Sequence, residues 1–198
     1  MSIKYGKEYK YAHANFSNTL CWLDTINIPV IKITTAVIVK DTIPDEKIEI
    51  LRDNCNNLRD RAMIDFLLST GIRVGELVRL NIDDIDFSER ECVVYGKGDK
   101  ERKAYFDAKT KIHLLNYIES RTDNNIALFV SLNKPHSRLT ESGVELRLRE
   151  MGKKLGVEKV HPHKFRRTMA TRAIEKGMPI EQVQKILGHE QIDTTLRY

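Results

Sequence analysis

The residues of this sequence best suited to chemistry carry positive charge, transfer protons or can act as a nucleophile. They are two arginines, two histidines, a lysine and a tyrosine: Arg73, Arg166, His163, His189, Lys97 and Tyr198. A phosphodiester carries negative charge on its non-bridging oxygens and gains more during nucleophilic attack. The planar fork of arginine donates two hydrogen bonds to such oxygens and does not deprotonate. This set of side chains is what breaking and rejoining a DNA phosphodiester without a metal ion would require.

Each side chain has a candidate role. Tyr198 is the candidate nucleophile, and its phenol, with an ordinary pKa of about 10, needs nearby cations and a base. The two arginines are candidates to hold the phosphate, and the second follows His163 at a spacing that puts both on one helix face. Lys97, in a glycine-rich turn, could protonate the leaving 5′ oxygen, and the histidines could donate to the phosphate or transfer protons. For any one of these residues alone, a structural or solvent-exposed role is the commoner explanation.

Four motifs contain these residues, and their order and spacing are more specific than any one of them. The motifs are Thr70-Gly71-Ile72-Arg73-Val74-Gly75-Glu76-Leu77, Gly96-Lys97-Gly98-Asp99-Lys100-Glu101-Arg102, His163-Lys164-Phe165-Arg166, and Leu187-Gly188-His189 with Tyr198 nine positions later. In this pattern the chain, from about Thr42 onward, resembles the tyrosine recombinases, the phage integrase family. That family has an arginine box, a lysine in a β-hairpin, a His-x-x-Arg box, and a Leu-Gly-His box followed by a tyrosine.

The resemblance implies a role for each matching residue. Tyr198 would attack the scissile phosphate, leaving a 3′-phosphotyrosyl link and a free 5′ hydroxyl, and Lys97 would be the general acid. Four side chains would hold the phosphate: Arg73, Arg166, His163 and His189. Glu76 would orient its neighbours, and further DNA contacts are expected at Lys100, Arg102, Lys164 and Arg167. Arg167 is a departure, because the family usually has a histidine there.

No metal and no cofactor are expected, because the covalent link conserves the bond energy. The sequence agrees with this expectation, since it contains no P-loop and no acidic metal cluster. Three cysteines, without a CxxC pair, argue against a disulfide framework and a zinc site and favour the reducing cytoplasm. No apolar run approaches the roughly 20 residues of a membrane span, and no secretion signal begins the sequence.

The composition fits a globular protein with a polyanionic partner. The chain has 198 residues, of which 41% are hydrophobic and 31% charged, with a net charge of +5 and a pI near 9.0. A basic balance favours nucleic acid as the partner, although the same charge also suits ordinary solubility. We therefore expect double-stranded DNA as the partner and no membrane association.

The predicted elements are mostly helical. Helices are expected at about 45–55, 57–70, 73–80, 108–120, 140–154, 163–175, 179–187 and 195–198, with strands at 85–87, 92–95 and 103–106. The last two strands flank the glycine-rich turn that holds Lys97, which is a hairpin signal. The fold class is therefore α+β, mainly α-helical with one small antiparallel sheet, and the resemblance implies the tyrosine recombinase catalytic-domain fold.

Two domains are expected. Residues 1–41 are interpreted as a remnant of the family's N-terminal core-binding domain and its linker, and residues 42–198 as the catalytic domain without the C-terminal helix that follows the tyrosine in the family. We expect a homo-oligomer, a tetramer, on DNA for a full-length protein and a monomer for this chain alone.

The predicted function is site-specific DNA recombination that integrates or excises a mobile element. One alternative is relaxation of supercoiled DNA like that of a type IB topoisomerase, which uses the same chemistry. The other is a non-catalytic DNA-binding protein with a helix-turn-helix in 173–198, which would not explain Arg73 or the lysine hairpin.

Overall fold

The computed structural model describes residues 41–96 and 101–188, which belong to one unit running from Lys40 to Tyr198. The described residues form α1 (Asp45–Asp53), α2 (Leu58–Thr70), α3 (Val74–Arg79), a 3-10 helix (Ile82–Asp84), β1 (Ile85–Asp86), β2 (Glu91–Tyr95), β3 (Glu101–Tyr105), α4 (Ala108–Glu119), α5 (Glu141–Lys154), α6 (Pro162–Glu175) and α7 (Ile180–Leu187). Several of the predictions fall on residues outside the described ranges. They are those for residues 1–40, Lys97, Lys100, His189, Tyr198 and the helix expected at 195–198.

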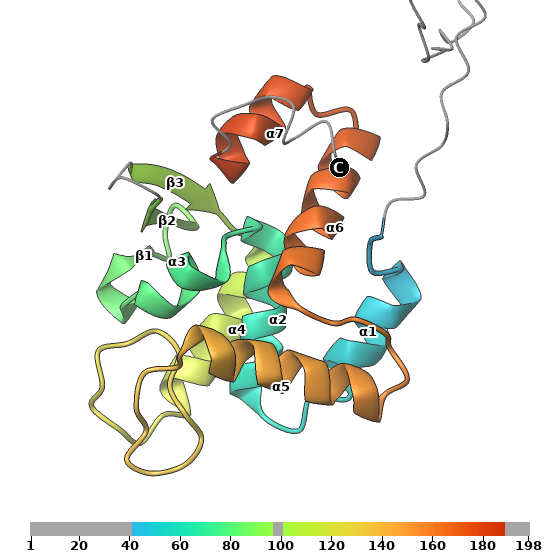
Figure 1. Cartoon of the computed structure of the whole chain (residues 1–198). Helices are drawn as coiled ribbons and strands as arrows, with labels where there is room; N and C mark the ends of the chain where they lie inside the picture. The colour runs from blue at the N-terminus through green and yellow to red at the C-terminus, as the bar shows by residue number, and fades with distance from the viewer. Residues whose placement is uncertain (1–40, 97–100, 189–198) are drawn as a thin grey trace, which may run out of the picture. The chain divides into compact units, whose positions relative to one another are not determined.

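Helix α2 lies at the centre, packed against α1, α4 and α6 (Figure 1). Its sequence is apolar almost all round near its end, which is typical of a helix that is buried there on every side. Phe66 is fully buried, and its ring lies 5.8 Å from that of Phe106 and 6.2 Å from that of Phe129, measured between centroids. Asn57 caps the start of the helix by accepting from the backbone N–H of Asp60, and Gly71 ends it in the left-handed conformation. The prediction of a central second helix is confirmed.

A buried carboxylate ties α2 to α5. Asp60 is fully buried and accepts hydrogen bonds from Arg59 (2.6 Å), Arg147 (2.7 Å) and Asn57 (2.8 Å). Arg59 also donates to the carbonyl of Val130 (3.2 Å). Because a buried carboxylate is costly without such partners, this network fixes how the first turn of α2 meets α5.

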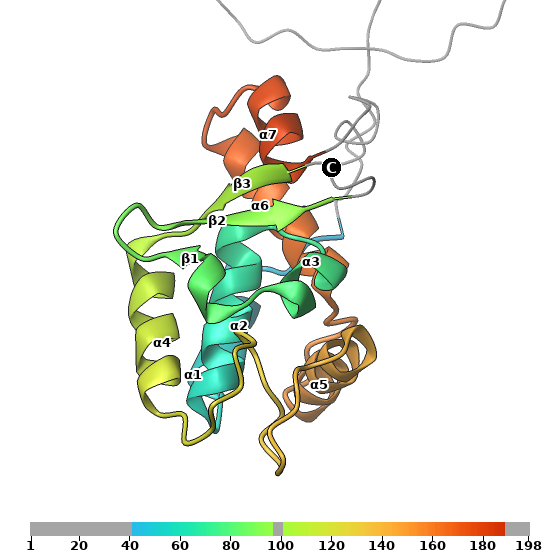
Figure 2. The same ribbon diagram turned by 90° about the vertical axis from the view of Figure 1, so that its left-hand side faces the viewer.

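The three strands form one antiparallel sheet in the order β1-β2-β3. In the pairing of β2 with β3, Cys92 lies opposite Ala104 and Val94 opposite Arg102. Residues directly opposite in a sheet share a face, and Cys92, Val94 and Ala104 are buried. Arg102 therefore lies on the inner face of the sheet, which covers one end of α2 next to α7 (Figure 2).

Helix α7 packs on α6 and β3. Its buried residues Val183 and Leu187 form a small apolar cluster with Ala170 of α6. The predicted fold class is confirmed, since helices dominate and one small antiparallel sheet is present in the part of the chain described. Two boundaries differ from the expected ones by two residues, and several others by one: α1 stops at Asp53, and β3 begins at Glu101 because the ladder continues to the pair Tyr95–Glu101. No helix within 41–96 and 101–188 is long and apolar enough to span a bilayer.

Candidate functional site

Three arginines from distant parts of the chain converge on the end of α7. Arg73 is the N-cap residue of α3, Arg102 lies in β3 and Arg166 lies in α6. They donate to three successive carbonyls, those of Gly188 (3.0 Å), Ile186 (2.9 Å) and Leu187 (2.5 Å) respectively. The last carbonyls of a helix lack partners within the helix and lie at the negative end of its dipole, so cations are favoured there. We call Arg73, Arg102 and Arg166 the arginine cluster.

Glu76 joins two members of this cluster. Its Oε1 accepts from Nη1 of Arg73 (2.9 Å), and its Oε2 accepts from Nη2 of Arg102 (2.6 Å). Its Oε2 also accepts from the backbone N–H of Arg73 (2.8 Å), which caps the first turn of α3. The side chain of Glu76 is only 4% exposed. One buried carboxylate thus faces two guanidinium groups at once.

Two motif glycines are required by this geometry. Gly188 has a φ of +64°, and a Cβ atom there would lie 2.7 Å from Cδ and 2.8 Å from Nε of Arg102. Gly71 has a φ of +60°, and its carbonyl accepts a hydrogen bond from Nη1 of Arg166 (2.6 Å). A side chain at either position would be strained, and at Gly188 it would also displace Arg102.

The arginine cluster is positively charged overall, and its three side chains differ in how far they are exposed. Arg166 is 3% exposed, whereas the side chain of Arg102 is 12% exposed and that of Arg73 is 43% exposed. Burial lowers the pKa of Arg102, Glu76 opposes that effect, and the charge of Arg73 adds to it. Arginine nevertheless stays charged in proteins. Three guanidinium groups against one carboxylate make this a site that attracts anions, and Arg73 is its most exposed donor.

His163 lies in the first turn of α6, three residues before Arg166, as the sequence predicted. Burial lowers the pKa of its imidazole, and the charges of Arg167, Arg166 and His161 lower it further. The ring is therefore neutral at neutral pH. A neutral imidazole next to an anion site can accept a proton from an attacking group.

The described residues that were predicted to contact DNA differ in how far they are buried and in what they contact. Lys164 is 8% exposed, and its ammonium pairs with Asp41 (2.9 Å) and donates to the carbonyl of Glu158 (3.3 Å). Arg102 is likewise engaged inside the protein, while Arg167 is half-buried. The structure thus brings Arg73, Glu76, Arg102 and Arg166 together and commits Lys164 to a contact with Asp41. Within the described ranges no three histidine, cysteine or acidic side chains gather as metal ligands would.

The role of Arg102 at the helix end was missed by sequence reasoning. The signal was present, because alternation in β3 puts Arg102 on the same face as the buried Ala104. A charged residue on the inner face of a strand needs internal partners. The sequence did not indicate that those partners would include a helix-end carbonyl.

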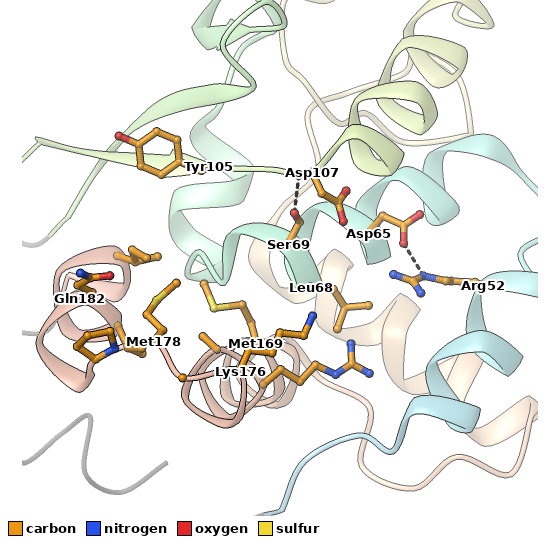
Figure 3. A pocket seen from close by; sticks show the side chains of 16 residues that line it. Arg52, Asp65, Leu68, Ser69, Tyr105, Asp107, Met169, Lys176, Met178 and Gln182 are labelled. Carbon is orange, nitrogen blue, oxygen red and sulfur yellow. Dashed lines mark hydrogen bonds and ion pairs between the residues drawn. The ribbon is translucent and has the colours of Figure 1, made fainter.

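A separate cavity of about 680 Å³ lies between α2, α6, α7 and β3, and the arginine cluster does not line it (Figure 3). Leu68, Met169 and Met178 supply apolar walls, and Lys176 lies beside them. Arg52 pairs with the buried Asp65 (2.5 Å) at one side of the cavity.

Comparison with known proteins identifies the class. The solved structure of the XerA recombinase superimposes with a TM-score of 0.73 at 35% sequence identity, covering 79% of this chain and 59% of XerA. The XerH site-specific recombinase, solved bound to its difH substrate before cleavage, matches with a TM-score of 0.68 at 25% identity over 85% of this chain and 52% of XerH. This arrangement of helices around a small antiparallel sheet is the fold of tyrosine recombinase catalytic domains.

The family follows from the sequence comparisons. The model of the phage integrase family matches residues 42–198, and the chain belongs to that family. Tyrosine recombinase XerC of Staphylococcus aureus is 40% identical over 152 residues, covering 74% of this chain and 50% of XerC. The chain thus spans about half the length of the curated relatives it matches.

Proposed function

We propose that this protein breaks and rejoins DNA strands at specific sites through a 3′-phosphotyrosyl intermediate on Tyr198. The observation that carries the proposal is the arginine cluster, which gathers three cations from α3, β3 and α6 at the end of α7. Electrostatic donors fixed in advance are worth most where charge develops during a reaction, as it does on a phosphodiester under attack. Membership of the phage integrase family supports the same reaction.

The steps assign one task to each group. The Oη of Tyr198 bonds to phosphorus as the bond from phosphorus to the 5′ oxygen breaks, and Arg73 and Arg166 hold the non-bridging oxygens. His163, neutral at neutral pH, accepts the phenolic proton, and Lys97 gives a proton to the departing 5′ oxygen. His189 adds a donor to the phosphate. Attack by a 5′ hydroxyl on the phosphotyrosine reverses these transfers and rejoins a strand, so the bond energy is conserved and no cofactor is consumed.

We propose double-stranded DNA as the substrate and residues 42–198 as the catalytic domain. The solved structure of XerH bound to a DNA substrate supports DNA as the partner. Exchange between two duplexes requires four strand cuts, so a protein with one nucleophilic tyrosine per subunit needs four subunits on DNA. We propose that tetramer for the full-length protein, a monomer for this chain alone, and the cytoplasm as its location.

The experiment is a selection for covalent attachment. A pool of nicked duplexes with randomised sequence is incubated with the protein in EDTA, and DNA that stays bound in hot detergent is recovered and sequenced. We expect recovery of a defined site by the wild type and none by Tyr198→Phe. Attachment that persists in the Phe variant, or cleavage that requires added Mg²⁺, would refute the proposal.

Two related activities are separated with the selected site. Joining of two duplexes that carry the site indicates recombination. Relaxation of a supercoiled plasmid without joining indicates activity like that of a type IB topoisomerase. Binding without any covalent product indicates a DNA-binding protein that is not an enzyme.

A further inference from the structure

We propose that Arg102 is a positioning residue, which keeps Arg73 available to the phosphate by occupying one oxygen of Glu76 and anchoring it to the end of α7. This inference rests on the proposed function. It differs from the sequence-based expectation that Arg102 contacts DNA.

The contacts of Arg102 point inward. Its Nη1 donates to the carbonyl of Ile186 (2.9 Å) and its Nη2 to Oε2 of Glu76 (2.6 Å). Its Cδ and Nε pack against Gly188, where even a Cβ atom would come within 2.7 to 2.8 Å. A guanidinium is planar and rigid, so these contacts fix the carboxylate of Glu76 relative to the last turn of α7.

The burial of Arg102 and its ion pair with Glu76 suit a group that acts through a neighbouring side chain. Only 12% of its side chain is exposed, compared with 57% for Lys103, the next residue in β3. Lys103 lies on the opposite face of the strand and pairs with Glu91 (2.5 Å). The two neighbours thus differ in exposure and in partners, so Lys103 is a matched control for the inward contacts of Arg102.

The effect on Arg73 follows from the geometry of ion pairs. A carboxylate opposite an arginine prefers a bidentate arrangement, in which both oxygens accept from one guanidinium. Here Nη2 of Arg102 and the backbone N–H of Arg73 both donate to Oε2 of Glu76, so Nη1 of Arg73 donates to Oε1 alone. Without Arg102, Glu76 keeps the backbone N–H of Arg73 but loses one of the two guanidinium groups that balance its charge. The guanidinium of Arg73, which should face the phosphate, then becomes more strongly paired inside the protein.

The test compares cleavage of two substrates by matched variants. Arg102→Met removes both donors and keeps the apolar stem, and Lys103→Met is the control on the same strand. Single-turnover cleavage is measured at saturating DNA on the site recovered by the selection. One substrate has the ordinary scissile phosphate, and the other carries a methylphosphonate there, in which a methyl group replaces one charged non-bridging oxygen. Arg73→Ala is run in parallel.

We expect Arg102→Met to cleave ordinary DNA about 10- to 100-fold more slowly, the range found for groups that orient a ligand through an intermediate residue. Lys103→Met should match the wild type. On the methylphosphonate the charge that Arg73 neutralises is absent, so Arg73→Ala and Arg102→Met should both come within a few-fold of the wild type. Arg102→Lys, whose single ammonium does not reproduce the planar fork, should cleave ordinary DNA at a rate between those of Arg102→Met and the wild type.

Several results would overturn the proposal. Equal slowing on both substrates would mean that Arg102 only supports the fold, as would failure of both Arg102 variants to fold by circular dichroism. Arg102→Met could instead cleave at the normal rate at saturating DNA but bind DNA more weakly, with the salt dependence of its affinity reduced by about one counterion. That result would mean that Arg102 contacts a phosphate. Failure of the wild type to cleave any DNA would refute the proposed function itself, and the role of Arg102 in it.

Discussion

Replacing Gly188 with alanine tests the packing at the end of α7. Gly188 has a φ of +64°, and its added methyl group would lie 2.7 Å from Cδ of Arg102. Gly156 offers a matched control, since its φ is +63° and no atom lies within 4 Å of a Cβ built there. Both substitutions impose the same left-handed strain, and only the one at Gly188 displaces Arg102.

The expected magnitudes follow from these two terms. An alanine in the left-handed region costs about 1–2 kcal/mol, which is the whole effect expected for Gly156→Ala. At Gly188 the displaced guanidinium also loses the equivalent of one of its two hydrogen bonds, to Glu76 or to the carbonyl of Ile186, and a hydrogen bond that involves a charged group is worth about 1.5–3 kcal/mol. Gly188→Ala should therefore cost about 3–5 kcal/mol, which is within the stability of an ordinary domain.

The assay is urea denaturation of both variants, combined with amide hydrogen exchange of α7 and single-turnover DNA cleavage. If the end of α7 detaches before the whole domain unfolds, the amide exchange rate in α7 rises. The loss in the free energy of global unfolding is then smaller than about 3–5 kcal/mol. Cleavage should fall strongly in Gly188→Ala and stay near that of the wild type in Gly156→Ala. Equal losses of stability, exchange protection and activity in the two variants would refute the proposed packing of Arg102 under Gly188.

Four further outcomes are expected. Lys97→Ala should cleave ordinary DNA slowly and be largely rescued by a 5′-bridging phosphorothioate, because a thiolate leaves without protonation. His163 should titrate below 6.5 in a histidine-resolved NMR experiment, and Arg167→Gln should raise its pKa by removing a like charge. Because this pKa is depressed on folding, the contribution of His163 to stability is complete above about pH 6.5 and is lost as the pH falls through its folded value. Cys92, buried and with its pKa raised to about 12, should resist iodoacetamide at pH 8 until urea unfolds the protein. Asp60→Ala should lower the free energy of unfolding by about 3 kcal/mol, because it leaves buried arginine charge without its partner.

Each of these outcomes can be contradicted. Lack of rescue on the sulfur substrate would remove Lys97 from the role of general acid, and rescue of Lys100→Ala alone would transfer that role to Lys100. A pKa of His163 at or above 6.5 would mean that desolvation and the neighbouring arginine charges do not disfavour its charged form. Rapid alkylation of native Cys92 would show that its described burial is wrong. A loss below 1 kcal/mol for Asp60→Ala would mean that its network adds little to stability.

Local patterns made much of the fold predictable. The apolar residues near the end of α2 predicted that this helix would be central, because a helix end that is apolar almost all round has to be buried almost all round. These residues are Ile64, Phe66, Leu67 and Leu68. The glycine-rich turn between two β-rich segments predicted the β2–β3 hairpin, whose strands are observed. Fixed spacings also predicted that His163 and Arg166 would share a helix, since helical periodicity depends only on neighbours in the sequence.

Contacts between segments far apart in the sequence were harder to predict. Arg102 meets Ile186 across 84 residues of sequence, and the acceptor is a backbone carbonyl, a group that every residue possesses. Sequence patterns therefore indicate that a buried arginine needs a partner without indicating which one. The pairing of Lys164 with Asp41 is similar, because its position in a helix start gave no sign that the ammonium would turn into the protein.

The most direct test of the account is the identity of the protein–DNA bond. Protein trapped on a nicked duplex in EDTA would be digested with a protease that cuts after lysine, and the peptide beginning at Ile186 would be analysed by mass spectrometry. The account predicts a nucleotide joined through its 3′ phosphate to Tyr198. A nucleotide on any other residue, or one joined through its 5′ phosphate, would contradict it.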